Sequence, residues 1–162
     1  MAKKSENPYG VTCCSPKEAL RRIEPGSSIF LGTGAAEPRT LVAELMASTM
    51  KNLEDLTLIQ LVSLGGAISL ADLQVQKYRL MTFFSGWGAS EAIKEGRVDL
   101  IPARFSQVPE LIASGRIPVD VAFVQIAPPR KDGYASLGVS IDVAIQAMSR
   151  ASRSAPEPAP RR

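Results

Sequence analysis

The chain has 162 residues, of which 45 % are apolar and 22 % are charged. This size and composition suit one domain with a real core, and they exclude two large domains and a chain that is disordered throughout. Histidine is absent, which excludes Ser-His-Asp triads, Cys-His pairs and histidine-ligated metals within this chain.

The charge pattern excludes a nucleic-acid surface. The formal net charge is +3, and residues 150–162 account for all of it with four arginines and one glutamate, so no basic face is predicted in the remainder. No apolar run approaches the roughly 20 residues of a membrane span, and no apolar segment follows Lys3 and Lys4 as in a secretory signal. We therefore expect a cytoplasmic protein that binds neither nucleic acid nor a membrane.

The two cysteines, Cys13 and Cys14, are neighbours in the sequence. A disulfide between adjacent residues is strained, and a metal site lacks the second pair of ligands that it would need. We expect reduced thiols and no metal site.

Helices and strands are expected to alternate along the chain. The first helix begins after Ser15, which can cap it, with Pro16 at the first helical position and Glu18 completing a capping box; it extends to about Ile23. Strands are expected at residues 28–31, 56–62, 78–84, 98–102 and 119–127. Further helices are expected from Pro38, at 89–95, from a Ser106 cap to Ala113, and at 142–150. Residues 67–76 are helical or irregular, and residues 135–140 form a short extended segment.

This alternation predicts an α/β fold, with an open, mostly parallel sheet and flanking helices. We expect residues 1–14 to form an amino-terminal arm and residues 15–148 the folded domain. Residues 149–162 are rich in serine, arginine and proline. Their alternating prolines cannot donate to a strand ladder or continue a helix, so a disordered tail is predicted.

The first candidate site is Gly32-Thr33-Gly34, between a strand and a helix. Glycine lets the backbone approach a ligand, and a helix start offers N–H groups to an oxyanion or phosphate. An ordinary strand-to-helix turn would also favour glycine. Glu37 stands where a dinucleotide fingerprint has its third glycine, so a Rossmann cofactor site is disfavoured.

A second candidate is the loop at residues 127–138, after the strongest predicted strand. Ligands gather outside the carboxyl ends of strands in open α/β sheets, and Tyr134 or Ser136 could contribute a hydroxyl there. A hairpin built from turn residues explains the same pattern. At a third junction, Ser106 most simply serves as a helix cap.

Five ordered motifs resemble the amino-terminal half of the acetyl-CoA hydrolase and acyl-CoA:carboxylate CoA-transferase family, which includes acetate and 4-hydroxybutyrate CoA-transferases. They are IFLGTGAAEP at 29–38, EGRVDLIP at 95–102, SQVPEL at 106–111, SGRIPVDVA at 114–122, and QIAPP at 125–129 with DGYASLGVS at 132–140. The resemblance extends from about Pro16 to Ala147.

The resemblance implies two related α/β halves with the active site between them. A glutamate attacks the acyl-CoA thioester, giving an acyl-glutamyl anhydride and then a glutamyl-CoA thioester, while backbone N–H groups stabilise the oxyanion. The substrates are an acyl-CoA and a small carboxylate, with no further cofactor. The implied site residues are Gly32, Thr33, Gly34 and Ala35 on the acyl side, and Gly133, Tyr134, Ser136 and Gly138 as a second wall.

The resemblance also predicts what this sequence lacks. The nucleophilic glutamate belongs to the carboxyl-terminal half, and Glu37 matches a different motif. We therefore expect a domain that is inactive alone and whose partner is the missing half, a full-length relative or, as a homo-oligomer, a second copy. The alternatives are a non-catalytic binding or dimerisation module, a truncated pseudoenzyme, or a sugar-phosphate isomerase that uses the Gly32 loop for phosphate.

Overall fold

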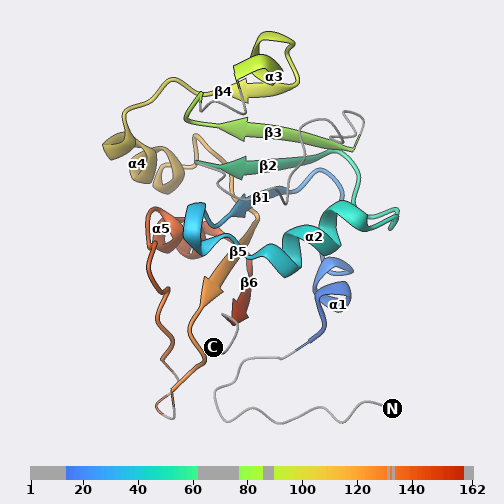
Figure 1. Ribbon diagram of the computed structural model, residues 1–162, viewed down its shortest axis with the longest axis vertical. Coiled ribbons are helices and arrows are strands. Elements are labelled where there is room, and N and C mark those ends of the chain that lie inside the picture. Colours follow the sequence, from blue (N-terminus) through green and yellow to red (C-terminus); the bar gives the residue numbers. More distant parts are fainter. Residues whose placement is uncertain (1–13, 62–76, 86–89, 131, 133, 159–162) are drawn as a thin grey trace.

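Helices and strands alternate around a single sheet (Figure 1). The computed structural model describes residues 14–61, 77–85, 90–130, 132 and 134–158. Its strands are β1 (Ser28–Leu31), β2 (Leu56–Gln60), β3 (Tyr78–Thr82), β4 (Val98–Leu100), β5 (Val121–Ile126) and β6 (Arg153–Pro158). Its α-helices are α1 (Pro16–Leu20), α2 (Arg39–Ala47), α3 (Ser90–Lys94), α4 (Val108–Ala113) and α5 (Ala144–Arg150), with 3-10 turns η1 (Gly34–Ala36) and η2 (Phe105–Gln107).

The strand order reverses its direction at β1. The strands lie in the order β4-β3-β2-β1-β5-β6, and all adjacent pairs are parallel. From β1 the chain moves outward through β2, β3 and β4, then crosses back to place β5 on the other side of β1. Such a reversal is a topological switch point, and ligands bind beside it at the carboxyl ends of the strands. The predicted α/β fold with a parallel sheet is confirmed.

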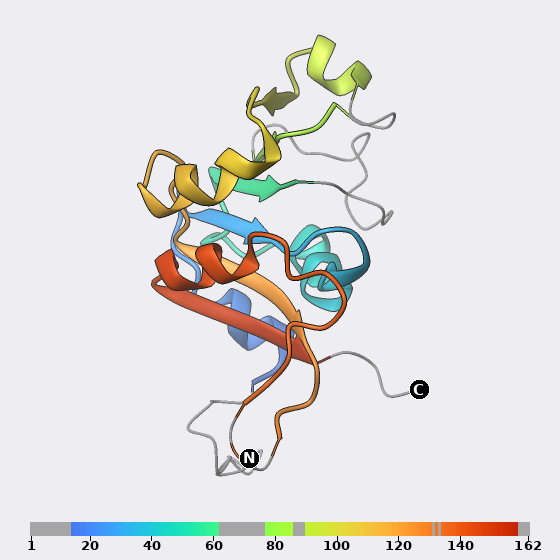
Figure 2. The same cartoon turned by 90° about the vertical axis from the view of Figure 1, so that its left-hand side faces the viewer.

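Both faces of the sheet are covered by helices (Figure 2). All four residues of β1 are buried. Ile29 and Leu31 pack in the core that includes residues of α1 and α2, whereas Phe30 packs in the core that includes residues of α4 and α5. This two-sided burial explains why the central strands read as continuous apolar runs rather than as alternating patterns.

The start of the domain agrees closely with the sequence. The hydroxyl of Ser15 accepts a hydrogen bond from the Glu18 amide at 3.2 Å, and the Glu18 carboxylate accepts one from the Ser15 amide at 2.9 Å. The predicted capping box is thus confirmed, although α1 ends at Leu20 rather than at Ile23. The predicted stretch at 67–76 lies outside the described residues. In the described part of the chain, no helix is long and apolar enough to cross a membrane.

The prediction that Ser106 caps a helix is wrong. Ser106 lies inside η2, and α4 begins only at Val108, with Gln107 as its N-cap. A Ser106 cap would put Pro109 at the third helical position. Proline has no N–H to donate to the capping hydroxyl, which removes one of the two bonds that such a cap could make.

The prediction of a disordered tail is also wrong for residues 149–158. Residues 149 and 150 end α5, and β6 pairs in parallel with β5 from Val121↔Arg153 to Ile126↔Pro158. The amide of Arg153 donates to the carbonyl of Asp120 at 3.3 Å. Because alternate residues of a parallel strand donate to the same neighbour, Pro156 and Pro158 occupy positions whose nitrogen faces away from β5. The sheet edge tolerates proline at such positions. Residues 159–162 lie outside the described part.

One buried hydroxyl links β3 to the end of α2. Tyr78 is 4 % exposed, and its hydroxyl donates to the carbonyl oxygen of Leu45 at 2.8 Å. Burial raises the pKa of Tyr78 above its ordinary value of 10.0. The folded protein therefore holds this proton to higher pH than the unfolded chain does.

We expect Tyr78→Phe to lower the free energy of unfolding by about 1 kcal/mol near neutral pH, because it removes this hydrogen bond. Urea denaturation measures the difference. Since the folded pKa is raised, the contribution is fully present below pH 10.0 and is lost as the pH rises further. The wild type should therefore approach the variant in alkaline solution, and a constant difference up to about pH 11 would contradict this assignment.

Candidate functional site

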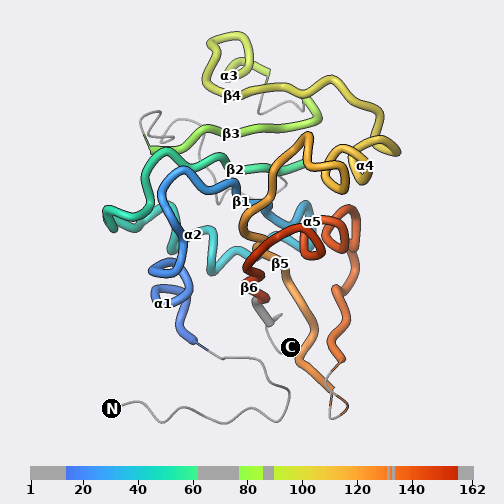
Figure 3. The backbone as a smooth tube through the Cα atoms, turned by 180° about the vertical axis from the view of Figure 1, so that it is seen from behind, coloured from blue at the N-terminus to red at the C-terminus, as the bar shows by residue number. Residues whose placement is uncertain are grey.

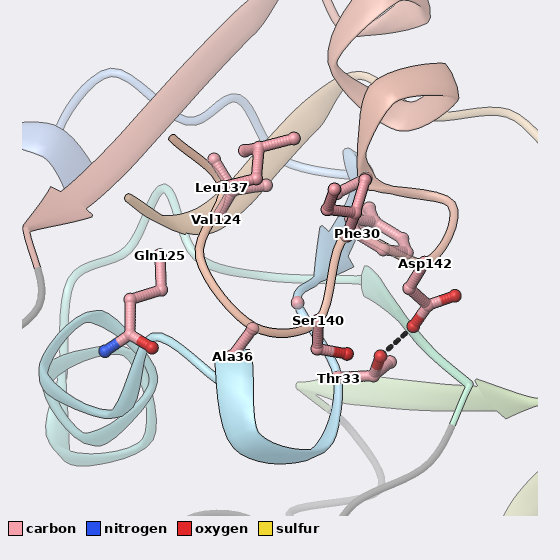
Figure 4. A pocket seen from close by; sticks show the side chains of 11 residues that line it. Phe30, Thr33, Ala36, Val124, Gln125, Leu137, Ser140 and Asp142 are labelled. Carbon is pink, nitrogen blue, oxygen red and sulfur yellow. Dashed lines mark hydrogen bonds between the residues drawn. The ribbon is translucent and has the colours of Figure 1, made fainter. Parts of the chain in front are cut away.

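A small pocket lies at the switch point between the carboxyl ends of β1 and β5 (Figure 4). The segment after β1, the end of β5 and the segment that leads into α5 contribute to it. Its lining residues are Phe30, Gly32, Thr33, Ala36, Val124, Gln125, Leu137, Ser140, Ile141, Asp142 and Ala144. Its volume is about 10 Å³, at the lower limit for a single water. These residues therefore form one side of a site and enclose no substrate by themselves.

The segment at residues 32–37, called here the glycine loop, turns sharply where it leaves the sheet. The Gly32 amide donates to the carbonyl of Phe123 at 2.9 Å, which keeps the loop attached to β5. The Ala36 amide donates back to the carbonyl of Thr33 at 3.0 Å, closing η1. A Cβ at Gly32 would lie 2.6 Å from the carbonyl oxygen of Ala36. The turn therefore requires glycine at this position.

The return limb, residues 137–142, brings the second candidate loop back to this glycine loop. The Thr33 hydroxyl donates a hydrogen bond to Oδ2 of Asp142 (Figure 4). Asp142 adopts a positive φ of 51°, and its Oδ1 accepts from the Val143 amide at 2.7 Å. This contact joins residues 109 positions apart and fixes the two loops relative to each other.

The predicted site residues lie partly in the pocket. Gly32 and Thr33 line it. Gly34 begins η1, Ala35 is exposed in that turn, and neither is among the lining residues. Gly133 lies outside the described residues. Tyr134 and Ser136 are exposed on the loop that precedes the return limb, and Gly138 is exposed within that limb.

The sequence analysis missed Ser140 and Asp142. Ser140 lies close to Thr33 on the pocket side of the return limb (Figure 4). A helix was expected from Asp142 onward, whereas α5 begins at Ala144. The sequence signal that could have identified Ser140 and Asp142 is their position shortly after Gly138, where the loop turns back toward the sheet. The two hydroxyls and the glycine backbone can contact a small polar substrate group. Among the lining residues that the structure describes, none is a glutamate.

The last residue of the glycine loop, Glu37, has a buried acidic side chain. Glu37 and Gln60 are each 2 % exposed, and Nε2 of Gln60 lies 3.5 Å from Oε1 of Glu37. The other carboxylate oxygen, Oε2, is buried and has no hydrogen-bond partner among the described residues. Leaving a polar group unpaired in the interior costs stability.

A larger hollow of about 260 Å³ lies at the amino ends of β1, β5 and β6. Its polar groups already pair with one another. Arg153 bonds the Glu24 carboxylate at 3.2 Å, and the Ser152 hydroxyl donates to the Asp120 carbonyl at 3.0 Å. Ligands in open α/β sheets bind at the opposite end, so we regard the smaller pocket as the candidate site.

In the described ranges, no three Cys, Asp or Glu side chains lie close enough together to bind a metal ion. The thiol of Cys14 is free and exposed. Cys13 lies outside those ranges.

Residues 1–154 match the model of the acetyl-CoA hydrolase/transferase N-terminal domain. The chain belongs to this family. Its sequence is 34 % identical over 135 residues to a succinyl-CoA:acetate/propanoyl-CoA:succinate CoA transferase of Fasciola hepatica, covering 83 % of this chain and 28 % of that protein. It is 31 % identical over 137 residues to a 4-hydroxybutyrate coenzyme A transferase of Clostridium kluyveri, covering 85 % of this chain and 32 % of that protein.

Solved structures agree with the fold of this acetyl-CoA hydrolase/transferase domain. RipA from Yersinia pestis superposes with a TM-score of 0.76 at 24 % identity, over 88 % of this chain and 35 % of that chain. The domain thus spans about a third of the length of the relatives that it matches. The larger share of each relative has no counterpart in this chain.

We expect Gly32→Ala to lower the free energy of unfolding by about 1–3 kcal/mol, because the new methyl group meets backbone that must shift. Thermal unfolding followed by circular dichroism measures this. Ala35→Ser, at an exposed position of the same turn, is the control and should leave the midpoint unchanged. Equal midpoints for both variants would contradict the close approach.

We expect Glu37→Gln to raise the free energy of unfolding by about 1 kcal/mol at pH 7, because a neutral amide loses less than a carboxylate on burial. Urea titration measures it. Glu91→Gln, on the exposed side of α3, is the control and should change little. Destabilisation by Glu37→Gln would mean that the carboxylate makes a favourable contact that the described residues do not provide.

Proposed function

We propose that this domain forms one wall of the active site of a CoA transferase or acetyl-CoA hydrolase, and that acyl transfer requires a carboxyl-terminal part. The supporting observation is the one-sided pocket at the switch point. Its volume of about 10 Å³ is far below the roughly 300 Å³ at which small-molecule sites begin. A second wall must come from polypeptide beyond the described residues for an acyl-CoA to be enclosed, and we assign it to the carboxyl-terminal part.

Each loop has a role in this proposal. The glycine loop, with Gly32, Thr33, Gly34 and Ala35, contacts the acyl side of the thioester, because glycine lets backbone approach the reacting carbonyl. The second candidate loop, with Gly133, Tyr134, Ser136 and Gly138, borders the cleft. Asp142 is a positioning residue that acts through its hydrogen bond with the Thr33 hydroxyl.

The reaction in this proposal proceeds through a glutamate of the carboxyl-terminal part. Its carboxylate attacks the thioester carbonyl carbon, the CoA thiolate leaves, and an acyl-glutamyl anhydride forms. The thiolate then attacks the glutamyl carbonyl and releases the acyl group as a carboxylate, leaving a glutamyl-CoA thioester. An acceptor carboxylate reverses these steps, whereas water in its place gives hydrolysis. CoA acts as a substrate carrier, and no other cofactor is needed.

The names of the relatives support a proposal for the substrate class. Their names include succinyl-CoA, acetate, propanoyl-CoA and 4-hydroxybutyrate, which are small carboxylates or CoA thioesters of small carboxylic acids. We propose that this domain takes the same class and acts in the cytoplasm.

The test combines the purified chain with the carboxyl-terminal part of the Clostridium kluyveri relative and measures acetyl-CoA:carboxylate exchange. We expect no exchange with the chain alone and exchange in the mixture, with a CoA adduct detected by mass spectrometry on the partner only. Exchange or an adduct on this chain alone would refute the placement of the nucleophile. No exchange in the mixture would refute the proposed function.

Matched variants test the wall itself. Thr33→Val removes the hydroxyl that bonds Asp142, and we expect the exchange rate in the mixture to fall at least about tenfold. Thr49→Val, at an exposed position beyond α2, is the control. Equal rates for both variants would show that the glycine loop does not border the reaction.

A further inference from the structure

The candidate pocket contains a carboxylate and no cation. Asp142 is the one ionisable side chain among the described residues that line the pocket, and no lysine or arginine is among them. Its two oxygens accept hydrogen bonds from uncharged groups, the Thr33 hydroxyl and the Val143 amide. The ion pairs of the described residues do not include Asp142. Its negative charge is therefore left uncompensated beside the pocket, where screening by solvent is weaker than on an open surface.

A second acidic side chain lies at the far end of the glycine loop. Glu37 is 2 % exposed, and its Oε1 lies 3.5 Å from the neutral side-chain amide of Gln60. The ion pairs of the described residues do not include Glu37 either. Two carboxylates thus lie against one short loop without a cation paired to them in the described ranges. Their combined potential disfavours a further anion at this wall.

The rest of the pocket lining is mostly apolar. Six of the lining residues have apolar side chains, namely Phe30, Ala36, Val124, Leu137, Ile141 and Ala144. The volume of about 10 Å³ accommodates about one water, and a methyl group is similar in size. In the proposed reaction the glycine loop contacts the acyl side of the thioester. The far end of a short acyl group therefore reaches the apolar lining and the carboxylate of Asp142.

The return limb holds Asp142 in a defined conformation. The two limbs of the β5–α5 loop run side by side (Figure 3), and the Ala127 amide donates to the carbonyl of Ser136 at 2.7 Å. Asp142 has a φ of 51°, which aspartate and asparagine adopt more readily than other residues with a side chain. Asparagine can keep both hydrogen bonds, because its oxygen accepts from the Val143 amide and its NH₂ group donates to the Thr33 hydroxyl. Asp142→Asn therefore removes the charge and retains the shape.

We propose that this pocket binds the apolar end of a short monocarboxylic acyl group, and that Asp142 excludes acyl groups that carry a second carboxylate. This inference rests on the proposed function and names the substrate class of the same site. The acceptor reverses the steps of the donor, so both occupy the same place and the exclusion applies to both. Butanoate and succinate isolate the effect, since both have four carbon atoms and only succinate ends in a second carboxylate.

The first experiment measures binding to the full chain alone. Butanoate and succinate are titrated at constant ionic strength, and the amide resonances of residues 32–36 and 140–142 are followed by NMR. We expect butanoate to bind about tenfold more tightly than succinate, because one extra negative charge is brought close to Asp142. Asp142→Asn should reduce this ratio to within about twofold, mainly by strengthening the binding of succinate.

Asp55→Asn is the matched control. Asp55 also has a positive φ, 55°, and is exposed just before β2, at the opposite end of the sheet from the pocket. The same chemical change there should leave the preference for butanoate unaltered. Thermal unfolding of both variants verifies that the fold is intact, and binding of butanoate to Asp142→Asn verifies that the pocket is intact.

The second experiment measures exchange in the mixture with the carboxyl-terminal part of the Clostridium kluyveri relative. We expect faster exchange from acetyl-CoA to butanoate than to succinate. Asp142→Asn should reduce the ratio of the two rates about tenfold, whereas Asp55→Asn should not change it.

The outcomes separate this inference from the proposed function. Absence of binding, equal binding of the two acids to the wild type, or a preference that Asp142→Asn leaves unchanged overturns the inference. Tighter binding of succinate also overturns it and would mean that the second carboxylate reaches a cation such as Arg39, which is exposed at the start of α2. Selective binding without exchange in the mixture supports the inference and refutes the proposed function. Exchange without a preference for butanoate does the reverse.

Discussion

Burial of β1 on both faces determines where a site can form in this domain. Ile29, Phe30 and Leu31 are fully buried between β2 and β5, and each contributes on the order of 2 kcal/mol of hydrophobic stabilisation. Such a strand has one fixed position in the sheet, so the segment that follows it begins at a fixed place. There the Gly32 amide donates a hydrogen bond to the Phe123 carbonyl, and the glycine loop turns away from the sheet directly afterwards. The location of the pocket therefore follows from the packing of the central strand.

The elements of the fold were readable from the sequence because their signals are local. The capping box at Ser15 and Glu18 and the apolar runs of the central strands each involve neighbours in the chain. The strand order was not readable, because it depends on pairs such as Ile29↔Val121. The error at β6 has the same origin: proline excludes an inner strand, but whether a strand lies at the edge is a property of the complete sheet.

The residues of the candidate site likewise divide into those that a local sequence pattern reveals and those that only the folded structure reveals. Gly32 and Thr33 were recognisable, since a glycine turn between a strand and a helix is a local pattern. Asp142 was not, because its role depends on a left-handed backbone and on a partner 109 residues away. The unpaired oxygen of Glu37 likewise appears only after folding. Its stability cost, borne next to the candidate loop, fits the common observation that functional regions are not optimised for stability.

The prolines of β6 restrict how this domain can join other molecules. The backbone nitrogens of Pro156 and Pro158 carry no hydrogen and face away from β5. An extended segment that paired with this edge would therefore lack two of its backbone hydrogen bonds. Growth of the sheet across two chains by main-chain pairing is disfavoured at this boundary, which also protects against fibre-like stacking. Binding of another protein by this domain must then depend on side chains and on the shape of its loops. A few substitutions at such positions can change which partner is bound.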